Sequence, residues 1–388
     1  MNVAVIVAAG RGSRAASAST SMPKQYVKLL GKPVLARTLS VFLGHPKIHE
    51  VVVVIHPDDE DLYQDVIPSR HTKLRTPVHG GTTRQASVLR GLEAFECLSP
   101  EYVVIHDAAR PFVTETVITQ SLIAAEKTGG AIVALPVTDT LKRASADNTI
   151  LATIDRSGLW RAATPQTFRF SSILAAHRAA AQSGQFGFTD DAGIAEADAQ
   201  SVSLVMGDSS NIKITTPADF AFAERLASQN LQVRCGSGYD VHRFVEGDAV
   251  LLCGVSIPHS QRLDGHSDAD VAMHALTDAI LGAIGDGDIG QHFPPNDQQW
   301  KGARSDVFLR DAARRVANRG GVISNVDVTI ICELPKIGPY RSKMQQHLAD
   351  VLEIDIGRVS IKATTSEGLG FTGRCEGIAA MASATVLA

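Results

Sequence analysis

The sequence predicts an α/β protein of two domains. A doubly wound, Rossmann-like domain is expected over residues 1–230, and an α+β domain of one sheet and a helical layer over residues 231–388. Three observations support this prediction. The length of 388 residues suits two domains. Strand-like and helix-like segments alternate in the first part, and a new apolar strand begins at Val233, after a helical segment that ends at residues 228–230.

The first part alternates buried strands with helices. Continuous runs rich in β-branched residues predict parallel strands at residues 3–7, 51–55, 102–105, 131–137 and 202–205. Helical periodicity predicts helices over residues 83–95, 116–127 and 220–232. This alternation is typical of a parallel sheet that is covered by helices on both faces.

The second part begins with the strand at Val233, which is expected to run into a glycine-rich turn. Further strands are predicted at residues 250–253, 326–332 and 359–363. Helices are predicted at residues 268–284, 306–319 and 342–352. These elements suit one sheet with a layer of helices.

Composition limits the classes of partner and compartment. The chain is 44% hydrophobic and 20% charged, with a net charge of −4, so neither a nucleic acid nor a membrane surface is expected as a partner. Its five cysteines are scattered without a C-x-x-C pair, which favours a reducing, cytoplasmic location. No stretch approaches the roughly 20 apolar residues of a membrane helix.

A glycine-rich loop follows the first predicted strand, with the sequence A-A-G-R-G-S-R at residues 8–14. Glycines after a parallel strand let backbone N–H groups approach a phosphate. The loop also carries Arg14 and, further on, Lys24. Bare amides with two cations suit a triphosphate that loses pyrophosphate, because they stabilise the charge on the leaving group.

Two other interpretations of this loop stay open. Gly10, Gly12 and Ala15 satisfy the pattern G-x-G-x-x-A, which would indicate an NAD-dependent oxidoreductase. That pattern calls for an acid about 20 residues further on, and no Asp or Glu occurs between Arg14 and Glu50. The remaining interpretation is a tight turn with solvated cations.

A second site is predicted late in the chain. Asp240 and His242 are two residues apart, so in an extended segment both side chains leave the same face. His274 lies eight residues after His266, inside the predicted helix. Two imidazoles and a carboxylate leave a fourth position open on a zinc-like ion, which is typical of catalytic zinc.

Other residues near this second site have simpler interpretations. Ser267 and Asp270 form the pattern S-x-x-D, which predicts a capping box for the following helix. Asp270 is therefore expected to be a cap or an outer group rather than a metal ligand. Thr365 and Glu367 can share one face of an extended segment and suit a phosphate and a hard cation such as magnesium, or else belong to a solvated loop.

Several separated motifs occur in order in the first part: the loop at 8–14, P-K-Q-Y at 23–26, G-G at 80–81 with Arg84 and Ser87, H-D-A-A-R-P at 106–111, and T-P-Q at 164–166. Together they resemble the 2-C-methyl-D-erythritol 4-phosphate cytidylyltransferases over about residues 1–228. The resemblance implies a cytidylyltransferase domain with CTP and methylerythritol phosphate as substrates, and magnesium or manganese as the ion.

The same resemblance implies site residues. Four cations would act in catalysis: Arg14, Lys24, Arg156 and Lys213. The implied substrate-binding residues are Ala8, Ala9, Gly10, Gly12, Gly81, Arg84, Ser87, Asp107, Arg110, Thr140 and Thr189. Thr140 and Arg156 would lie on an arm that reaches into a neighbouring subunit, and the polar, turn-rich segment 139–161 suits an arm. Taken without the family, Arg156 would be a solvated hairpin residue.

The second part also contains a series of motifs in order: G-Y-D-V-H at 238–242, H-S-D-x-D at 266–270, His274, D-I-G at 288–290, T-T-x-E at 364–367 and F-T-G-R at 371–374. Together they resemble the 2-C-methyl-D-erythritol 2,4-cyclodiphosphate synthases over about residues 233–388. The resemblance implies zinc on Asp240, His242 and His274, and a magnesium or manganese ion on Glu367.

In that family, His266 and Thr365 would stabilise the charge that moves during the reaction. The implied substrate-binding residues are Ser267, Asp288, Ile289, Gly290, Cys332, Lys336, Thr364, Ser366, Phe371 and Arg374. Among these, Asp288 would hold the erythritol hydroxyls, and Cys332 and Lys336 would lie at the cytidine pocket.

The two resemblances together imply a bifunctional enzyme of non-mevalonate isoprenoid precursor synthesis. The two steps are not consecutive, since a kinase acts between them. The resemblance also suggests that kinase as a partner of the chain. A homo-oligomer with dimeric and trimeric contacts is expected. Besides the oxidoreductase, the alternative is a non-catalytic scaffold, which intact motifs in both halves disfavour.

Overall fold

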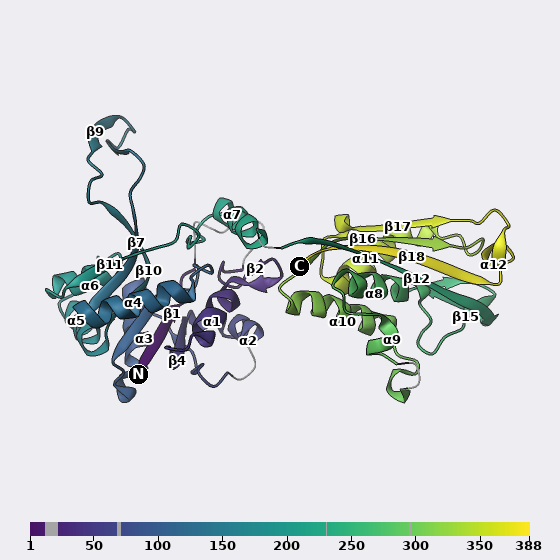
Figure 1. Cartoon of the computed structure of the whole chain (residues 1–388), viewed down its shortest axis with the longest axis horizontal. Coiled ribbons are helices and arrows are strands. Elements are labelled where there is room, and N and C mark those ends of the chain that lie inside the picture. The colour runs from purple at the N-terminus through teal and green to yellow at the C-terminus, as the bar shows by residue number, and fades with distance from the viewer. Residues whose placement is uncertain (12–21, 68–70, 230, 295–296) are drawn as a thin grey trace. The chain divides into compact units, whose positions relative to one another are not determined.

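The computed structural model describes residues 1–11, 22–67, 71–229, 231–294 and 297–388. The chain divides into two compact units, Met1–Leu226 and Ala227–Ala388, each with its own main sheet (Figure 1). No helix in the described ranges is both long and apolar enough to span a membrane.

The main sheet of the first unit contains every strand that the sequence predicts there. In spatial order its strands are β11 (Val202–Met206), β7 (Gly130–Pro136), β10 (Trp160–Arg169), β6 (Tyr102–Asp107), β1 (Asn2–Val7), β4 (Glu50–Ile55) and β5 (Val78–His79). β10 was not predicted, and it runs antiparallel to both of its neighbours, β6 and β7. Its mixed sequence of Trp, Arg, Thr, Pro and Gln lacks the continuous β-branched pattern of the parallel strands.

Helices cover both faces of this sheet, as a doubly wound fold requires. They are α1 (Val34–Gly44), α2 (Glu60–Val66), α3 (Arg84–Glu93), α4 (Glu115–Thr128), α5 (Phe170–Gln182), α6 (Asp191–Ala197) and α7 (Pro217–Ser228). Ala4 and Ile6 of β1 share a core with α1, α2 and α4, whereas Val3 and Val5 share one with α3 and α5. Alternate residues of one strand therefore enter two hydrophobic cores, and the predicted fold is confirmed.

A hairpin projects from the first unit between β7 and β10 (Figure 1). It consists of β8 (Leu141–Ala144) and β9 (Ile150–Ile154), which pair with each other and with no other strand of the described chain. Ile150 and Leu151 on it are 63% and 62% exposed. The short pair β2 (Lys28–Leu29) and β3 (Lys32–Pro33) follows the phosphate-loop segment.

The second unit has one mixed sheet. Its strands in spatial order are β15 (Gln261–Leu263), β12 (Val233–Glu246), β18 (Gly377–Leu387), β16 (Val322–Ile331) and β17 (Val359–Thr364). Only β16 and β17 pair in parallel among these. The hairpin β13 (Ala249–Leu252) and β14 (Val255–Pro258) stands beside it.

A helical layer packs on this sheet, as the sequence predicts. The helices are α8 (Val271–Ala283), α9 (Ile289–His292), α10 (Ser305–Asn318), α11 (Arg341–Leu352) and α12 (Gly370–Gly373). α8 is the central one, because its buried face shares one core with β12, β16 and β18. The final strand β18 was not predicted, since its run of alanines carries no strand signal.

The glycines of β12 permit its close contact with α8. The predicted turn at these glycines is wrong, because β12 continues without interruption from Val233 to Glu246. A Cβ added at Gly236 would overlap the carbonyl oxygen of Ala279, and one at Gly238 would overlap that of Ala275. The glycines are thus present to bring the strand against the helix backbone rather than to bend the chain.

Gly238→Ala is expected to destabilise the second unit by about 3 kcal/mol, because neither backbone can move away without opening the core. Denaturant-dependent hydrogen exchange of α8 amides measures this unit separately. Gly282→Ala on α8 is the control: an added Cβ meets nothing within 4 Å, so a gain of about 0.5–1 kcal/mol from helix propensity is expected. Equal stability of the two variants would contradict the packing argument.

Candidate active sites

The carboxyl edge of the first sheet carries the predicted nucleotide site. β1 pairs in parallel with β6 and β4, and its last residue, Val7, lies opposite Asp107 and Val54. The loop that begins at Ala8 and the carboxylate of Asp107 therefore emerge at the same edge. Ala8 N–H donates to Val54 O at 2.7 Å, which holds the first residue of the loop.

Asp107 is surrounded by positive side chains. Its Oδ1 lies 3.1 Å from Arg84 Nε, and its Oδ2 lies 2.7 Å from Lys213 Nζ and 3.9 Å from Arg110 Nε. Burial alone would raise the pKa of Asp107, but Arg84 and Lys213 outweigh it and hold the pKa well below that of an ordinary carboxyl group. The carboxylate is therefore ionised at neutral pH and can bind a cation.

A second buried carboxylate holds Arg84 from the other side. Arg84 Nη2 lies 2.9 Å from Asp191 Oδ2, and Asp191 Oδ1 lies 3.2 Å from His177 Nε2. Burial would lower the pKa of Arg84, but Asp191 and Asp107 raise it above its ordinary value. The sequence did not predict Asp191 or His177 as part of this network, because they lie on α6 and α5 and no motif surrounds them.

The phosphate-binding loop is described only in part, since Gly12 and Arg14 lie outside the described residues. Gln25 anchors the part before them. Its Nε2 donates to Ala8 O at 2.7 Å and to Gly10 O at 3.3 Å. The amide of Gln25 thus holds the start of the loop in place, a role that the sequence did not assign to it.

Lys24 reaches the same edge of the sheet. Its Nζ donates to Ile214 O at 2.7 Å, and Ile214 N–H in turn donates to Ala109 O at 2.9 Å. Because Ile214 follows Lys213 in the chain, the predicted cations Lys24 and Lys213 lie near each other, with Lys213 on the carboxylate of Asp107.

The turn that the resemblance assigns to the base is closed by its own hydrogen bonds. Gly81 N–H donates to Ser87 Oγ at 3.1 Å, and Ser87 Oγ donates to Thr83 O at 2.9 Å. Ser87 is buried at the start of α3. In this structure Ser87 therefore fixes the shape of the turn.

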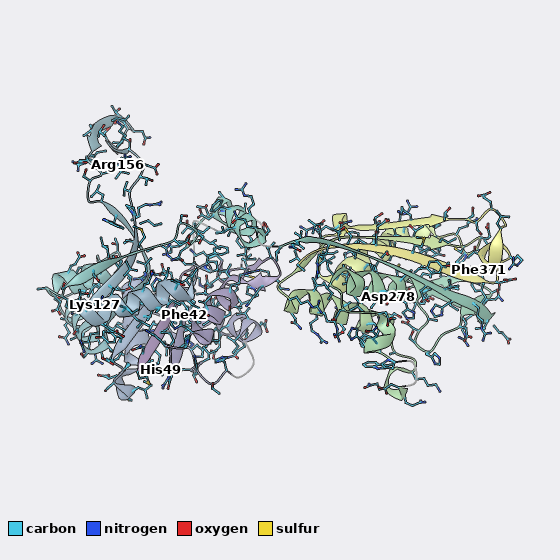
Figure 2. All side chains as sticks on the ribbon, in the orientation of Figure 1. Phe42, His49, Lys127, Arg156, Asp278 and Phe371 are labelled. Atoms are coloured by element: carbon cyan, nitrogen blue, oxygen red, sulfur yellow. The ribbon has the colours of Figure 1, made fainter. Side chains whose placement is uncertain are left out.

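Two predicted residues lie on the projecting hairpin. Arg156 is on the arm, away from the sheet (Figure 2), and donates to Thr138 O. Thr140 precedes β8 in the same segment and is exposed. Within one chain, Arg156 is therefore not brought to the Asp107 cluster. Thr189 lies in an exposed turn just before α6.

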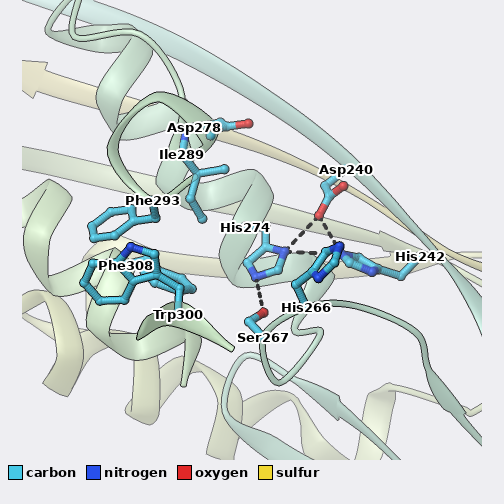
Figure 3. Close-up of a pocket in the computed structure, with 11 residues that line it drawn as sticks. Asp240, His242, His266, Ser267, His274, Asp278, Ile289, Phe293, Trp300 and Phe308 are labelled. Carbon is cyan, nitrogen blue, oxygen red and sulfur yellow. Dashed lines mark hydrogen bonds and ion pairs between the residues drawn. The ribbon is translucent and has the colours of Figure 1, made fainter. Parts of the chain in front are cut away.

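The second unit brings together the predicted metal ligands. Asp240 Oδ2 lies 3.0 Å from His242 Nε2 and 3.1 Å from His274 Nδ1, and these two nitrogens are 3.2 Å apart (Figure 3). They form a candidate metal cluster, with ligand atoms within 4.8 Å of one another. Asp240 and His242 share the face of β12 that looks toward α8, as their spacing predicts.

Both imidazoles are oriented by outer hydrogen bonds. His242 Nδ1 lies 2.5 Å from the carbonyl oxygen of Asp264 and must donate to it, which leaves the Nε2 lone pair directed at the cluster. His274 Nε2 lies 3.0 Å from both Ser267 Oγ and Ser305 Oγ, so its Nδ1 faces the cluster. Burial alone would lower the pKa of His242, but the carboxylate of Asp240 outweighs it and raises the pKa.

Asp270 is a helix cap, as predicted, and not a ligand. Its Oδ1 accepts from Met273 N–H at 3.1 Å and from Cys253 N–H at 2.9 Å, and its Oδ2 accepts from Gly254 N–H at 2.7 Å. The prediction that Ser267 begins a capping box is wrong, because the helix starts at Val271 and Asp270 itself is the N-cap.

A pocket of about 260 Å³ opens beside the cluster. His266 and Ser267 line it on one side, and the aromatic residues Phe293, Trp300 and Phe308 pack together on the other (Figure 3). The three aromatic residues were not predicted. Phe293 follows α9, Trp300 lies in the single helical turn Gln298–Trp300, and Phe308 lies on α10, and no motif marks the group in the sequence.

The predicted D-I-G motif also borders this pocket, through Ile289 and Gly290. Asp288 caps the short helix α9, where its Oδ1 accepts from Gln291 N–H at 2.9 Å. Asp278 lines the pocket and accepts from Ile289 N–H at 2.8 Å. The sequence analysis did not assign Asp278, although it lies one helical turn after His274 on the same face of α8.

The other predicted synthase residues lie across the sheet from the cluster. Val241 of β12 is opposite Ala379, which is opposite Ile331, which is opposite Thr364. Three inter-strand steps of about 4.8 Å each place Thr364 roughly 14 Å from Val241. Glu367 follows Thr364 and is not part of the metal cluster in the described chain.

This distant group is held together by its own hydrogen bonds. Thr365 Oγ1 donates to Glu367 Oε1 at 2.7 Å, and Ser366 N–H donates to Glu333 Oε1 at 3.0 Å. Cys332 is buried nearby, with its N–H donating to Thr364 O at 3.1 Å, and burial raises the pKa of its thiol to about 11. Lys336 follows in the next turn and is exposed.

Phe371 and Arg374 lie at the end of this group, Phe371 on α12 and Arg374 directly after it. Arg374 is exposed and pairs with Glu376, with Nε 2.8 Å from Oε1. Phe371, labelled in Figure 2, is half-buried. The structure thus brings the predicted synthase residues together as two groups. One lies around β12 and α8, and the other lies beyond the end of β17.

Two family models match the chain. Residues 2–229 match the model of 2-C-methyl-D-erythritol 4-phosphate cytidylyltransferase, and residues 233–387 match that of the YgbB family. In the solved structure of 4-diphosphocytidyl-2C-methyl-D-erythritol synthase from Anaerococcus prevotii, 96% of the chain aligns with 59% of this one. The identity is 32% and the TM-score is 0.52, which supports the fold of the first unit.

Curated relatives match along nearly the whole length. The protein named bifunctional enzyme IspD/IspF of Bradyrhizobium sp. strain ORS 278 is 54% identical over 385 residues, which cover 99% of this chain and 96% of that one. The protein of the same name from Rhodopseudomonas palustris strain HaA2 is 53% identical, with coverages of 99% and 94%. The chain therefore belongs to the family of bifunctional IspD/IspF enzymes, with a methylerythritol phosphate cytidylyltransferase unit followed by a cyclodiphosphate synthase unit.

Proposed function

We propose that each unit catalyses its own reaction of isoprenoid precursor synthesis. In residues 1–230, CMP passes from CTP to 2-C-methyl-D-erythritol 4-phosphate, and pyrophosphate leaves. In residues 231–388, 4-diphosphocytidyl-2-C-methyl-D-erythritol 2-phosphate closes to the 2,4-cyclodiphosphate, and CMP leaves. Family membership supports both reactions. The assignment of sites rests on one observation: each unit gathers its own charged cluster, around Asp107 and around Asp240.

In the transferase, the cations are proposed to stabilise phosphate charge. Lys24, together with Arg14, would hold the triphosphate and the leaving pyrophosphate, as positioned positive charges do. Arg156 and Lys213 would hold the methylerythritol phosphate that attacks. The ionised oxygens of Asp107 are hard donors of the kind that Mg²⁺ or Mn²⁺ takes, which supports Asp107 as the residue that holds the ion.

In the synthase, Asp240, His242 and His274 are proposed to hold zinc. Two imidazole nitrogens and one carboxylate oxygen, with the nitrogens already oriented inward, fit that ion. A bound zinc ion supplies a Lewis acid for the diphosphate. His266 and Ser267 would bind a phosphate at the pocket.

The distant group of the synthase is proposed to serve the β-phosphate and the cytidine. Glu367 would hold a magnesium or manganese ion, and Thr365 would stabilise the moving charge beside it. Cys332 and Lys336 would border the cytidine. The hydrogen bond from Thr365 to Glu367 supports their acting as a pair.

Both active sites are proposed to be completed between copies of the chain in a homo-oligomer. The two synthase groups lie roughly 14 Å apart on one sheet, so a second copy can supply one group to the other. One face of that sheet is open, with Tyr239 56%, Val241 38% and Met381 53% exposed, which suits trimeric contacts. The arm that carries Arg156 suits a dimeric contact in the transferase.

Mixing two inactive variants tests this proposal. Lys24→Ala breaks the phosphate loop and leaves the arm intact, whereas Arg156→Ala does the reverse. In a random dimer about half of the assemblies are mixed, and each of these holds one intact site, so cytidylyl transfer should recover to roughly a quarter of wild type. The measurement is pyrophosphate release after co-refolding, with subunit exchange verified by mass spectrometry. No recovery would place Arg156 in the site of its own chain.

The cellular setting is also proposed. The product of the first reaction lacks the 2-phosphate that the substrate of the second reaction carries, so a kinase must act between the two reactions. We propose that this kinase associates with the chain. The described cysteines are free, which supports the reducing cytoplasm as the location.

A further inference from the structure

His274 is linked to a carboxylate that lies outside the metal cluster. His274 Nε2 lies 3.0 Å from Ser305 Oγ, the first residue of α10. Ser305 Oγ donates to Asp268 Oδ1 at 2.5 Å, and Ser305 N–H donates to Asp268 Oδ2 at 2.9 Å. Ser305 is fully buried, whereas its partner Asp268 is partly exposed.

The hydrogen positions in this series of hydrogen bonds, from Asp268 through Ser305 to His274, can be assigned. A carboxylate only accepts, so the hydroxyl hydrogen of Ser305 points at Asp268. The oxygen of Ser305 then offers only lone pairs to His274, whose Nε2 must carry the hydrogen. The lone pair of His274 is therefore on Nδ1, the atom that faces Asp240 and His242.

We propose that Asp268 and Ser305 are positioning residues for the metal ligand His274. They fix its ring orientation and its tautomer and raise the basicity of Nδ1, as a carboxylate linked to a ligating imidazole does at metal sites. This inference rests on the proposed metal site at Asp240, His242 and His274. The sequence suggested Asp270 as an outer group of the metal site, but its carboxylate instead accepts hydrogen bonds from the backbone N–H groups of Met273 and Gly254.

Backbone hydrogen bonds also tie the loop that carries His266 and Ser267 to the segment before α10. Asp268 N–H donates to Ala303 O at 3.0 Å, and Gly302 N–H donates to His266 O at 2.8 Å. The segment before Ser305 is thereby held against the loop that carries His266 and Ser267. Asp268 thus sets the position of Ser305 relative to His274 through backbone contacts as well as its carboxylate.

Ser267 offers a matched comparison. Its Oγ lies at the same 3.0 Å from His274 Nε2, but it accepts from Ala269 N–H at 3.3 Å and has no carboxylate partner in the described chain. Ser267 lines the pocket. Since Nε2 carries a hydrogen, the hydroxyl hydrogen of Ser267 is directed elsewhere and is available to a substrate phosphate.

The test is the zinc affinity of the full chain, measured by competition with a chromogenic chelator after removal of bound metal. Ser305→Ala should weaken zinc binding by about 10–100-fold. Ser267→Ala should bind zinc nearly as wild type does. Asp268→Asn keeps the side-chain volume and should also weaken binding. In a double variant with Ser305→Ala it should add little, because Asp268 acts through Ser305.

The outcomes separate this inference from the site on which it rests. If wild type and His274→Ala bind zinc equally, the proposed metal site is wrong. If wild type binds more tightly than His274→Ala but Ser305→Ala and Asp268→Asn match wild type, the positioning role is wrong. An equal loss in Ser267→Ala would also overturn it. Should Ser305→Ala lose the circular dichroism of wild type, Asp268→Asn decides the question.

Discussion

The double variant His242→Ala/His274→Ala is expected to lose its zinc and its CMP release while it keeps CTP-dependent transfer. Only Asp240 would remain of the three ligands, and one carboxylate does not hold zinc at a defined site. Loss of a Lewis acid worth several kcal/mol should slow the cyclisation by more than about 10³-fold. The transferase should be unaffected, because its cluster around Asp107 belongs to the other unit.

The measurements are elemental analysis and the two product assays on the same purified chain. His259→Ala is the matched control, because it removes another histidine of the second unit that stacks on Phe244 and does not line the pocket. The control should retain zinc and both activities. One zinc per chain in the double variant would show that this triad is not the metal site.

Lys24→Ala is expected to slow pyrophosphate release by about 10²–10³-fold, the usual loss for one preorganised charge donor. Lys24 is already held at the sheet edge by its bond to Ile214 O. It therefore needs little reorganisation to meet the charge that develops on the leaving group. CMP release by the synthase should hardly change.

The control for this change is Lys127→Ala, which removes an equal charge from the exposed last turn of α4. It should leave both rates near wild type. Single-turnover kinetics with saturating CTP would separate the chemical step from substrate binding. A near-normal rate of transfer in Lys24→Ala would mean that Lys24 has only a structural role at the loop.

Much of the site could be predicted from short-range spacing. Asp240 and His242 leave β12 on one face because alternate residues of a strand do so, and Asp270 caps α8 because its carboxylate reaches the amide three residues on. The phosphate-loop glycines follow β1 for a similar local reason. These features depend on covalent geometry within a few residues, so the sequence contains them.

Residues that act through distant partners could not be predicted in this way. Asp191 reaches Arg84 only because α6 packs near α3, and Ser305 reaches Asp268 across 37 residues of chain. Phe293, Trp300 and Phe308 form one wall only after α10 is in place. None of these contacts has a characteristic spacing, because the separation along the chain does not set the distance.

The sequence by itself determined the alternation of strands and helices, the family, and the three residues of the candidate metal cluster, since periodicity and motif spacing are local properties. Only the tertiary structure decided that β10 runs antiparallel between β6 and β7, and that the glycines of β12 meet α8 instead of forming a turn. It also brought the hydroxyls of Ser267 and Ser305 to His274. The reason is physical: strand order, close packing and hydrogen-bond partners depend on which elements meet, and each such meeting is selected by the core as a whole.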